Sequence, residues 1–189
     1  MDVQSDASIV EAEKQVSSIL GDAGLSLLIN NSGVATAYNI DEAPNRAAIL
    51  SCLDTNVAGV LVVSQVFLPL IRKAAKANAS LPVSVARAGI VNISSGAASI
   101  TDNRSGGMIV YRTSKTALNS LTKTFSLHVD KDDILCVAIL PGYVATRMTG
   151  AKGELTVEQS IGLMTSALNT FGREQQGGFF GKDGKPFPL

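Results

Sequence analysis

Aromatic residues and cysteines are scarce in this sequence of 189 residues. Aromatic residues make up 5% of the chain, although 46% of all residues are hydrophobic. This balance predicts an aliphatic core, which is typical of layered α/β proteins. The only cysteines, Cys52 and Cys136, each lie in an apolar run. Two thiols provide neither a disulfide framework nor a metal site, so we expect two reduced core residues and no metal.

An excess of charge of either sign is also missing. Sixteen Lys and Arg residues balance sixteen Asp and Glu residues. No basic cluster is dense enough to favour nucleic acid or a membrane surface as a partner. A small neutral or weakly charged substrate fits this balance better.

The N-terminal residues lack the features of a secretory signal. Residues 1–6 contain no basic flank followed by an apolar segment. Asn, Ser or Gln residues interrupt the longest apolar stretches short of a membrane span. We therefore expect one cytoplasmic domain over residues 1–189, without membrane contact.

The spacing of apolar residues predicts helices and strands that alternate along the chain. Spacings of three and four residues predict helices over 9–20, 45–77, 110–129 and 156–170, and Pro69 is expected to kink the second. Short apolar runs predict strands over 25–30, 88–95, 134–140 and 177–180. This alternation predicts a parallel sheet with crossover helices, whose ligands bind at the carboxyl ends of the strands.

A tyrosine and a lysine four residues apart stand near the start of the third predicted helix. Tyr111 and Lys115 would project from one helix face. A nearby ammonium stabilises phenolate and lowers the pKa of a tyrosine, so Tyr111 could exchange a proton with a carbonyl or alcohol oxygen. The alternative interpretation is a surface pair, and the spacing alone does not decide between them.

Two further polar residues occupy informative positions. Ser95 closes the second predicted strand, where its hydroxyl could hydrogen-bond the same substrate oxygen or could simply cap a turn. Asn56 interrupts the apolar face of the long helix. A buried amide there needs hydrogen bonds, either to neighbouring backbone or to a water that connects Lys115 with solvent as a proton relay.

Five motifs together resemble the short-chain dehydrogenase/reductase family, in the family's order. They are Asn30-Asn31-Ser32-Gly33, Asn56-Val57-Ala58-Gly59, Asn92-Ile93-Ser94-Ser95, Tyr111-x-x-x-Lys115 and Pro141-Gly142-Tyr143-Val144-Ala145-Thr146. Three further segments are similar to the C-factor and sniffer-like carbonyl reductases. They are Gly106-Gly107-Met108, the stretch 68–78 and the Gly-Gly-Phe tail.

This resemblance implies a Rossmann-like, doubly wound parallel sheet and a set of site residues. It implies NADPH-dependent reduction of a small-molecule carbonyl, although NAD is not excluded, and pairing of identical chains through the two long helices. The implied catalytic residues are Asn56, Ser95, Tyr111 and Lys115. Those implied at the cofactor, besides Tyr111 and Lys115, are Asp2, Val3, Asn30, Gly33, Pro141, Gly142, Val144 and Thr146.

The sequence departs from the family at its beginning. Family members start with a strand and a Thr-Gly-x-x-x-Gly-x-Gly turn, and the first Gly pair here, Gly21 and Gly24, precedes a strand. We therefore expect the first three strands and their helices to be missing, leaving a partial domain with weak cofactor binding. Two hypotheses remain: a carbonyl reductase recorded in truncated form, or a catalytically silent fragment that pairs with a full-length homologue.

Overall fold

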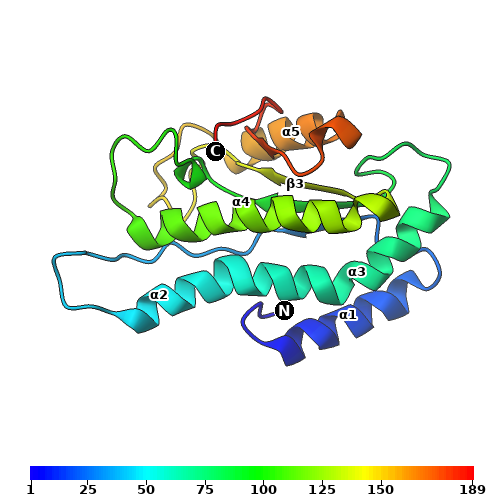
Figure 1. Ribbon diagram of the computed structural model, residues 1–189, viewed down its shortest axis with the longest axis horizontal. Helices are drawn as coiled ribbons and strands as arrows, with labels where there is room; N and C mark the ends of the chain where they lie inside the picture. The colour runs from blue at the N-terminus through cyan, green and yellow to red at the C-terminus, as the bar shows by residue number, and fades with distance from the viewer.

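The computed structural model describes residues 1–189 as an α/β fold (Figure 1). Helices and strands alternate along the chain, with short 3₁₀ turns at 96–98, 130–132 and 173–175. The helices are α1 (Asp6–Leu20), α2 (Arg46–Leu53), α3 (Gly59–Ala77), α4 (Ile109–Val129) and α5 (Val157–Leu168); the strands are β1 (Leu27–Asn30), β2 (Gly89–Ile93), β3 (Leu135–Ile139) and β4 (Phe179–Phe180).

The four strands form one parallel sheet in the order β1-β2-β3-β4. Leu27 pairs with Gly89, and Gly89 pairs with Leu135. The strands β1, β2 and β3 therefore begin at the same level of the sheet. The carboxyl ends of these strands therefore lie at one edge of the sheet. This confirms the Rossmann-like parallel sheet predicted from the sequence.

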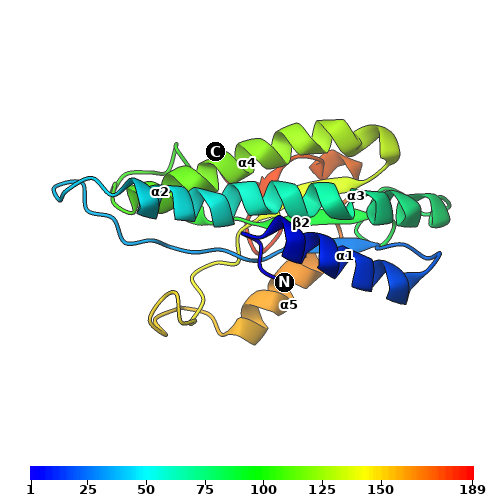
Figure 2. The same cartoon turned by 90° about the horizontal axis from the view of Figure 1, so that it is seen from below.

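Side chains of alternating strand positions build a core on each face of the sheet. On one face, Ile90 and Cys136 pack with α1, α3 and the end of α4. On the other, Val91 and Val137 pack with α5 and with Phe171 and Phe180, whose rings are tilted and 4.6 Å apart between centroids. Figure 2 shows α4 and α5 on opposite sides of the strands. Cys136 is buried and free, as predicted.

The structure corrects the single long helix predicted over residues 45–77. The five residues Asp54–Ala58 form a π-helical turn between α2 and α3. Such a turn contains one residue more than an α-turn and occurs mostly at functional sites. Asn56 lies in this turn and is fully buried.

The long helix also corrects the expectation that no apolar stretch reaches membrane-spanning length. By length and composition, the continuous helix Arg46–Ala77 could cross a membrane. A core helix of a folded domain meets the same criterion. Here ten residues of α3 are buried, and the helix packs against α1 and β1.

Candidate active site

The start of α4 is set by three residues with left-handed backbone conformations. Gly106, Gly107 and Met108 have φ values of 63°, 70° and 45°. Glycine adopts this region without strain, whereas a residue with a Cβ, such as Met108, is destabilised there by about 1–2 kcal/mol. The three residues turn the chain into α4 so that Tyr111 lies in its first turn.

Lys115 is buried one turn further along α4. Its residue surface is 4% exposed, and its Nζ donates a 2.8 Å hydrogen bond to the carbonyl oxygen of Ile93. No carboxylate lies within ion-pairing distance. Burial lowers the pKa of Lys115 to about 8, and the neighbouring Cys52 opposes this shift. The surface-pair interpretation of Tyr111 and Lys115 is therefore wrong.

Tyr111 is partly buried, and its pKa moves in the opposite direction to the one expected. Burial raises the pKa of the phenol, because phenolate loses hydration. The Ser95 hydroxyl lies beside the phenol and lowers the pKa by hydrogen bonding, but by less than burial raises it. Lys115 is not among the groups that shift this pKa, so the expected lowering by Lys115 is not found. Tyr111 is thus held as a neutral phenol.

Ser95 has the capping role considered for it, and its role at a substrate oxygen stays a prediction. Its Oγ accepts a 3.1 Å hydrogen bond from the backbone nitrogen of Ala97 and so caps the 3₁₀ turn Gly96–Ala98. The hydroxyl also lies within hydrogen-bonding reach of the Tyr111 phenol. The capping bond fixes the position of the hydroxyl at the end of β2.

The side chain of Asn56 joins the π-turn to the segment after β1. It accepts a hydrogen bond from the nitrogen of Val34 and donates to the oxygen of the same residue, both at 2.9 Å. It also donates to the Ser114 hydroxyl at 2.9 Å. These contacts are the structural alternative proposed for Asn56, and the relay through a water stays a prediction.

Sequence reasoning missed two members of this network. The Cys52 thiol lies 3.5 Å from the Asn56 amide nitrogen and 3.7 Å from the Ser114 hydroxyl. Cys52 was predicted only to be a buried core residue. The signal available in the sequence was its position four residues before Asn56, which puts both on one helix face.

Gly33 brings the backbone close to the buried cation. A Cβ on this residue would lie 3.3 Å from Nζ of Lys115 and 3.4 Å from Oδ1 of Asn56. The absence of a side chain therefore leaves space beside the ammonium. This supports the placement of Gly33 at the site.

The other predicted cofactor residues divide into three groups. Asn30 turns into the core, where its amide donates to Ser64 and Asn92 at 3.0 and 2.8 Å. Asp2 and Val3 precede α1, and Val3 packs at Gly59. The third group follows β3 and consists of Pro141, Gly142, Val144 and Thr146. Ser160 donates to the oxygen of Pro141, and Thr149 contacts Val144 and Thr146 by hydrogen bonds.

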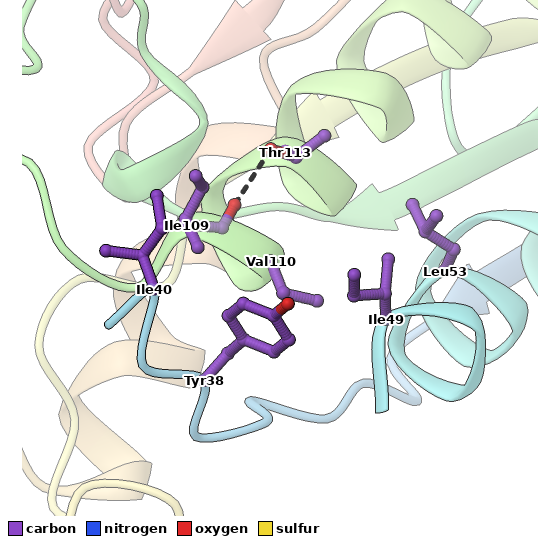
Figure 3. Close-up of a pocket in the computed structure, with 7 residues that line it drawn as sticks. All are labelled: Tyr38, Ile40, Ile49, Leu53, Ile109, Val110 and Thr113. Carbon is purple, nitrogen blue, oxygen red and sulfur yellow. Dashed lines mark hydrogen bonds between the residues drawn. The ribbon is translucent and has the colours of Figure 1, made fainter. Parts of the chain in front are cut away.

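An apolar pocket of about 290 Å³ lies against the opposite face of α4 (Figure 3). Figure 3 shows Tyr38 and Ile49 facing Val110 across it. Helix geometry places Ile109 and Thr113 about 180° from Tyr111 and Lys115 around the axis. This pocket is therefore separate from the group of polar residues described above.

Comparison with known proteins identifies the family. A family model described as short chain dehydrogenase matches residues 1–155. The chain belongs to the short-chain dehydrogenase family. The short-chain dehydrogenase anuI of Penicillium roqueforti is 30% identical over 162 residues, which cover 84% of this chain and 62% of that protein. The chain thus spans less than two thirds of the length of this relative.

Two solved carbonyl reductase structures are similar over the whole chain. The carbonyl reductase Sniffer of D. melanogaster is 37% identical with a TM-score of 0.96, and the match covers 100% of this chain and 76% of Sniffer. The NADPH-bound carbonyl reductase from chicken fatty liver is also 37% identical, with a TM-score of 0.93 and coverages of 100% and 75%. The resemblance to sniffer-like carbonyl reductases is confirmed.

Proposed function

We propose that this chain carries the proton-transfer part of an NADPH-dependent carbonyl reductase. The observation that carries the proposal is the neutral Tyr111 phenol beside the Ser95 hydroxyl, one helical turn from a buried ammonium without a carboxylate partner. The NADPH-bound chicken carbonyl reductase supports the choice of cofactor. The substrate class is a small, weakly charged molecule with a ketone or aldehyde group.

The residues around Lys115 fit the nicotinamide-ribose end of such a cofactor. An ammonium has three N–H donors, and Lys115 uses one of them on Ile93. The two remaining donors suit the hydroxyls of a ribose, and Gly33 leaves room for the sugar beside them. The 189 residues contain no Thr-Gly-x-x-x-Gly-x-Gly turn, so our proposal concerns this end of the cofactor only.

Tyr111 is proposed as the acid in the reduction. When bound, NADPH would supply the hydride for the carbonyl carbon. The Tyr111 hydroxyl gives its proton to the carbonyl oxygen. Ser95 donates a hydrogen bond to the same oxygen as negative charge develops on it. The raised pKa of Tyr111 keeps the acid protonated at neutral pH. Lys115 holds the ribose, and Asn56 fixes the segment that contains Gly33.

Replacing the phenol tests this assignment. We expect Tyr111→Phe to lower the rate of NADPH-dependent reduction of a model aromatic aldehyde by at least about 100-fold, because the acid is removed. The measurement is the loss of NADPH absorbance with the full chain. Tyr38→Phe is the matched control, since Tyr38 lines the apolar pocket against the opposite face of α4.

Two results would contradict the proposal. One is reduction by Tyr111→Phe at the rate of the unmodified chain. The other is a complete lack of NADPH binding by the unmodified chain in a fluorescence titration, which would favour the silent-fragment hypothesis.

A further inference from the structure

A second pocket lies at the end of the sheet opposite to Tyr111. It has a volume of about 300 Å³ and combines four cationic and two acidic side chains. We call it the basic pocket, and its lining residues are Arg72, Ala75, Lys76, Ala79, Arg87, Lys131, Asp132 and Asp133. Arg87 precedes β2 and Ser95 follows it, so the length of this strand, about 16 Å, separates the pocket from the candidate active site.

We propose that the basic pocket binds a phosphate group, either free or as a small phosphomonoester. Four cations and two carboxylates leave two positive charges in the pocket, which match a phosphate dianion. The adjacent pair Arg173 and Asp130 adds no net charge to this balance. The two carboxylates and the concave shape disfavour an extended polyanion.

The hydrogen bonds of the two arginines leave donors free. Nε of Arg72 donates to Asp132 at 2.8 Å, and its two terminal nitrogens have no partner. The terminal nitrogens of Arg87 donate to Leu81 and Asp133 at 3.1 and 2.8 Å, whereas its buried Nε has no hydrogen-bond partner. A buried donor without an acceptor is destabilising. The free terminal nitrogens of Arg72, which lines the pocket, are the donors from which a phosphate oxygen would accept.

Lys76 and Lys131 supply the charge that no carboxylate neutralises. Both are exposed, and neither makes a salt bridge or a side-chain hydrogen bond. The carboxyl-terminal end of α3 attracts cations, which accounts for a lysine in its last turn. It does not account for Arg87 and Lys131, which line the same pocket from outside that helix.

Titration of the full chain with inorganic phosphate at constant ionic strength tests the proposal. Amide NMR shifts are expected to saturate and to concentrate at residues 72–79, 87 and 131–133. The double variant Lys76→Gln/Lys131→Gln is expected to bind phosphate about tenfold more weakly, because it removes both unpaired charges. Lys152→Gln is the matched control, since this exposed lysine lies in the loop after β3 at the other end of the sheet.

Two further probes distinguish the source of the phosphate. Saturation by glycerol 3-phosphate without sedimentation on vesicles containing phosphatidic acid would indicate a soluble ligand. Sedimentation that the double variant loses would indicate a lipid phosphate. Two outcomes would overturn the proposal: NMR shifts that do not saturate with phosphate, and shifts that are the same in the double variant. Either would indicate that the lysines only stabilise the carboxyl-terminal end of α3.

Discussion

Lys115, which we propose as a cofactor-binding residue, lies in an environment that is unfavourable for a charge. Its 4% exposure and its single hydrogen bond leave a cation in the core without a counter-ion. A charge removed from water lowers stability unless it is paired, so the fold is destabilised at this position. We attribute the retention of the charge to the ribose hydroxyls of the proposed cofactor.

The stability of the protein is expected to rise with pH because of Lys115. Its folded pKa is about 8 against 10.5 for the free side chain, so the unfolded chain binds more protons between these pH values. Unfolding therefore becomes less favourable from pH 8 to about pH 9, by about 1 kcal/mol. Above pH 9 the raised pKa of the buried Cys136 thiol opposes this trend, because the unfolded chain then loses the thiol proton first. Urea unfolding at several pH values measures this slope.

Lys115→Met is expected to remove that slope and to stabilise the protein at pH 7. Lys123→Met is the control, since Lys123 is exposed on the same helix. If wild type and Lys115→Met show the same dependence on pH, Lys115 is not the group responsible.

The sequence predicted the members of the candidate site better than their contacts. The spacing of Tyr111 and Lys115 indicated a shared helix face but not the burial of the ammonium. Burial depends on the packing of α4 over β2, which brings Ile93 to Lys115. The Cys52 and Ser114 contacts depend in the same way on the approach of α2 to α4.

The connection between α1 and β1 shows how an element is fixed by one close contact. Gly21 caps α1 with φ of 54°, and Gly24 follows with φ of 75°. A Cβ on Gly24 would lie 2.5 Å from the nitrogen of Ala74 and 2.6 Å from the oxygen of Leu70, whereas nothing lies within 4 Å of one on Gly21. The turn thus rests directly on the backbone of α3.

Substituting alanine for each of these two glycines is expected to distinguish the energetic cost of backbone strain from that of a steric clash. Gly21→Ala should destabilise the protein by about 1 kcal/mol, since only the left-handed conformation is affected. Gly24→Ala should cost at least about 3 kcal/mol, because α3 and the turn must also move apart. Equal losses of unfolding free energy in urea would show that the contact with α3 is unimportant.

The positions of the other elements followed closely from the apolar pattern, but the π-turn did not. Spacings of three and four residues recur on both sides of Asn56, and one inserted residue changes them too little to be noticed. The hydrogen bonds from Asn56 to Val34 and Ser114 stabilise the insertion. A pattern of local hydrophobicity contains no information on such distant partners.

For the molecule as a whole, β1 is the most exposed part of the sheet. It pairs only with β2, and Ile29 in its middle is 49% exposed. An apolar edge strand is a template for pairing with another chain. The structurally similar Sniffer chain is longer, since the match covers 76% of it.

Charge on this edge is expected to reduce self-association. Ile29→Lys should lower light scattering at high protein concentration and change the unfolding free energy by less than about 0.5 kcal/mol, since the side chain is half exposed. Ile29→Leu retains the apolar surface and serves as the control. Equal light scattering by both variants would show that self-association does not occur through β1.

The parallel sheet also has a consequence for the rate of folding. The hydrogen bond between Asn30 and Asn92 joins β1 to β2 across 62 residues of chain. A parallel pair cannot form through a tight turn, so each strand pairing waits for the closure of a long loop that includes at least one helix. Refolding after dilution from urea is therefore expected to be slow compared with that of helical bundles, on the order of milliseconds to seconds.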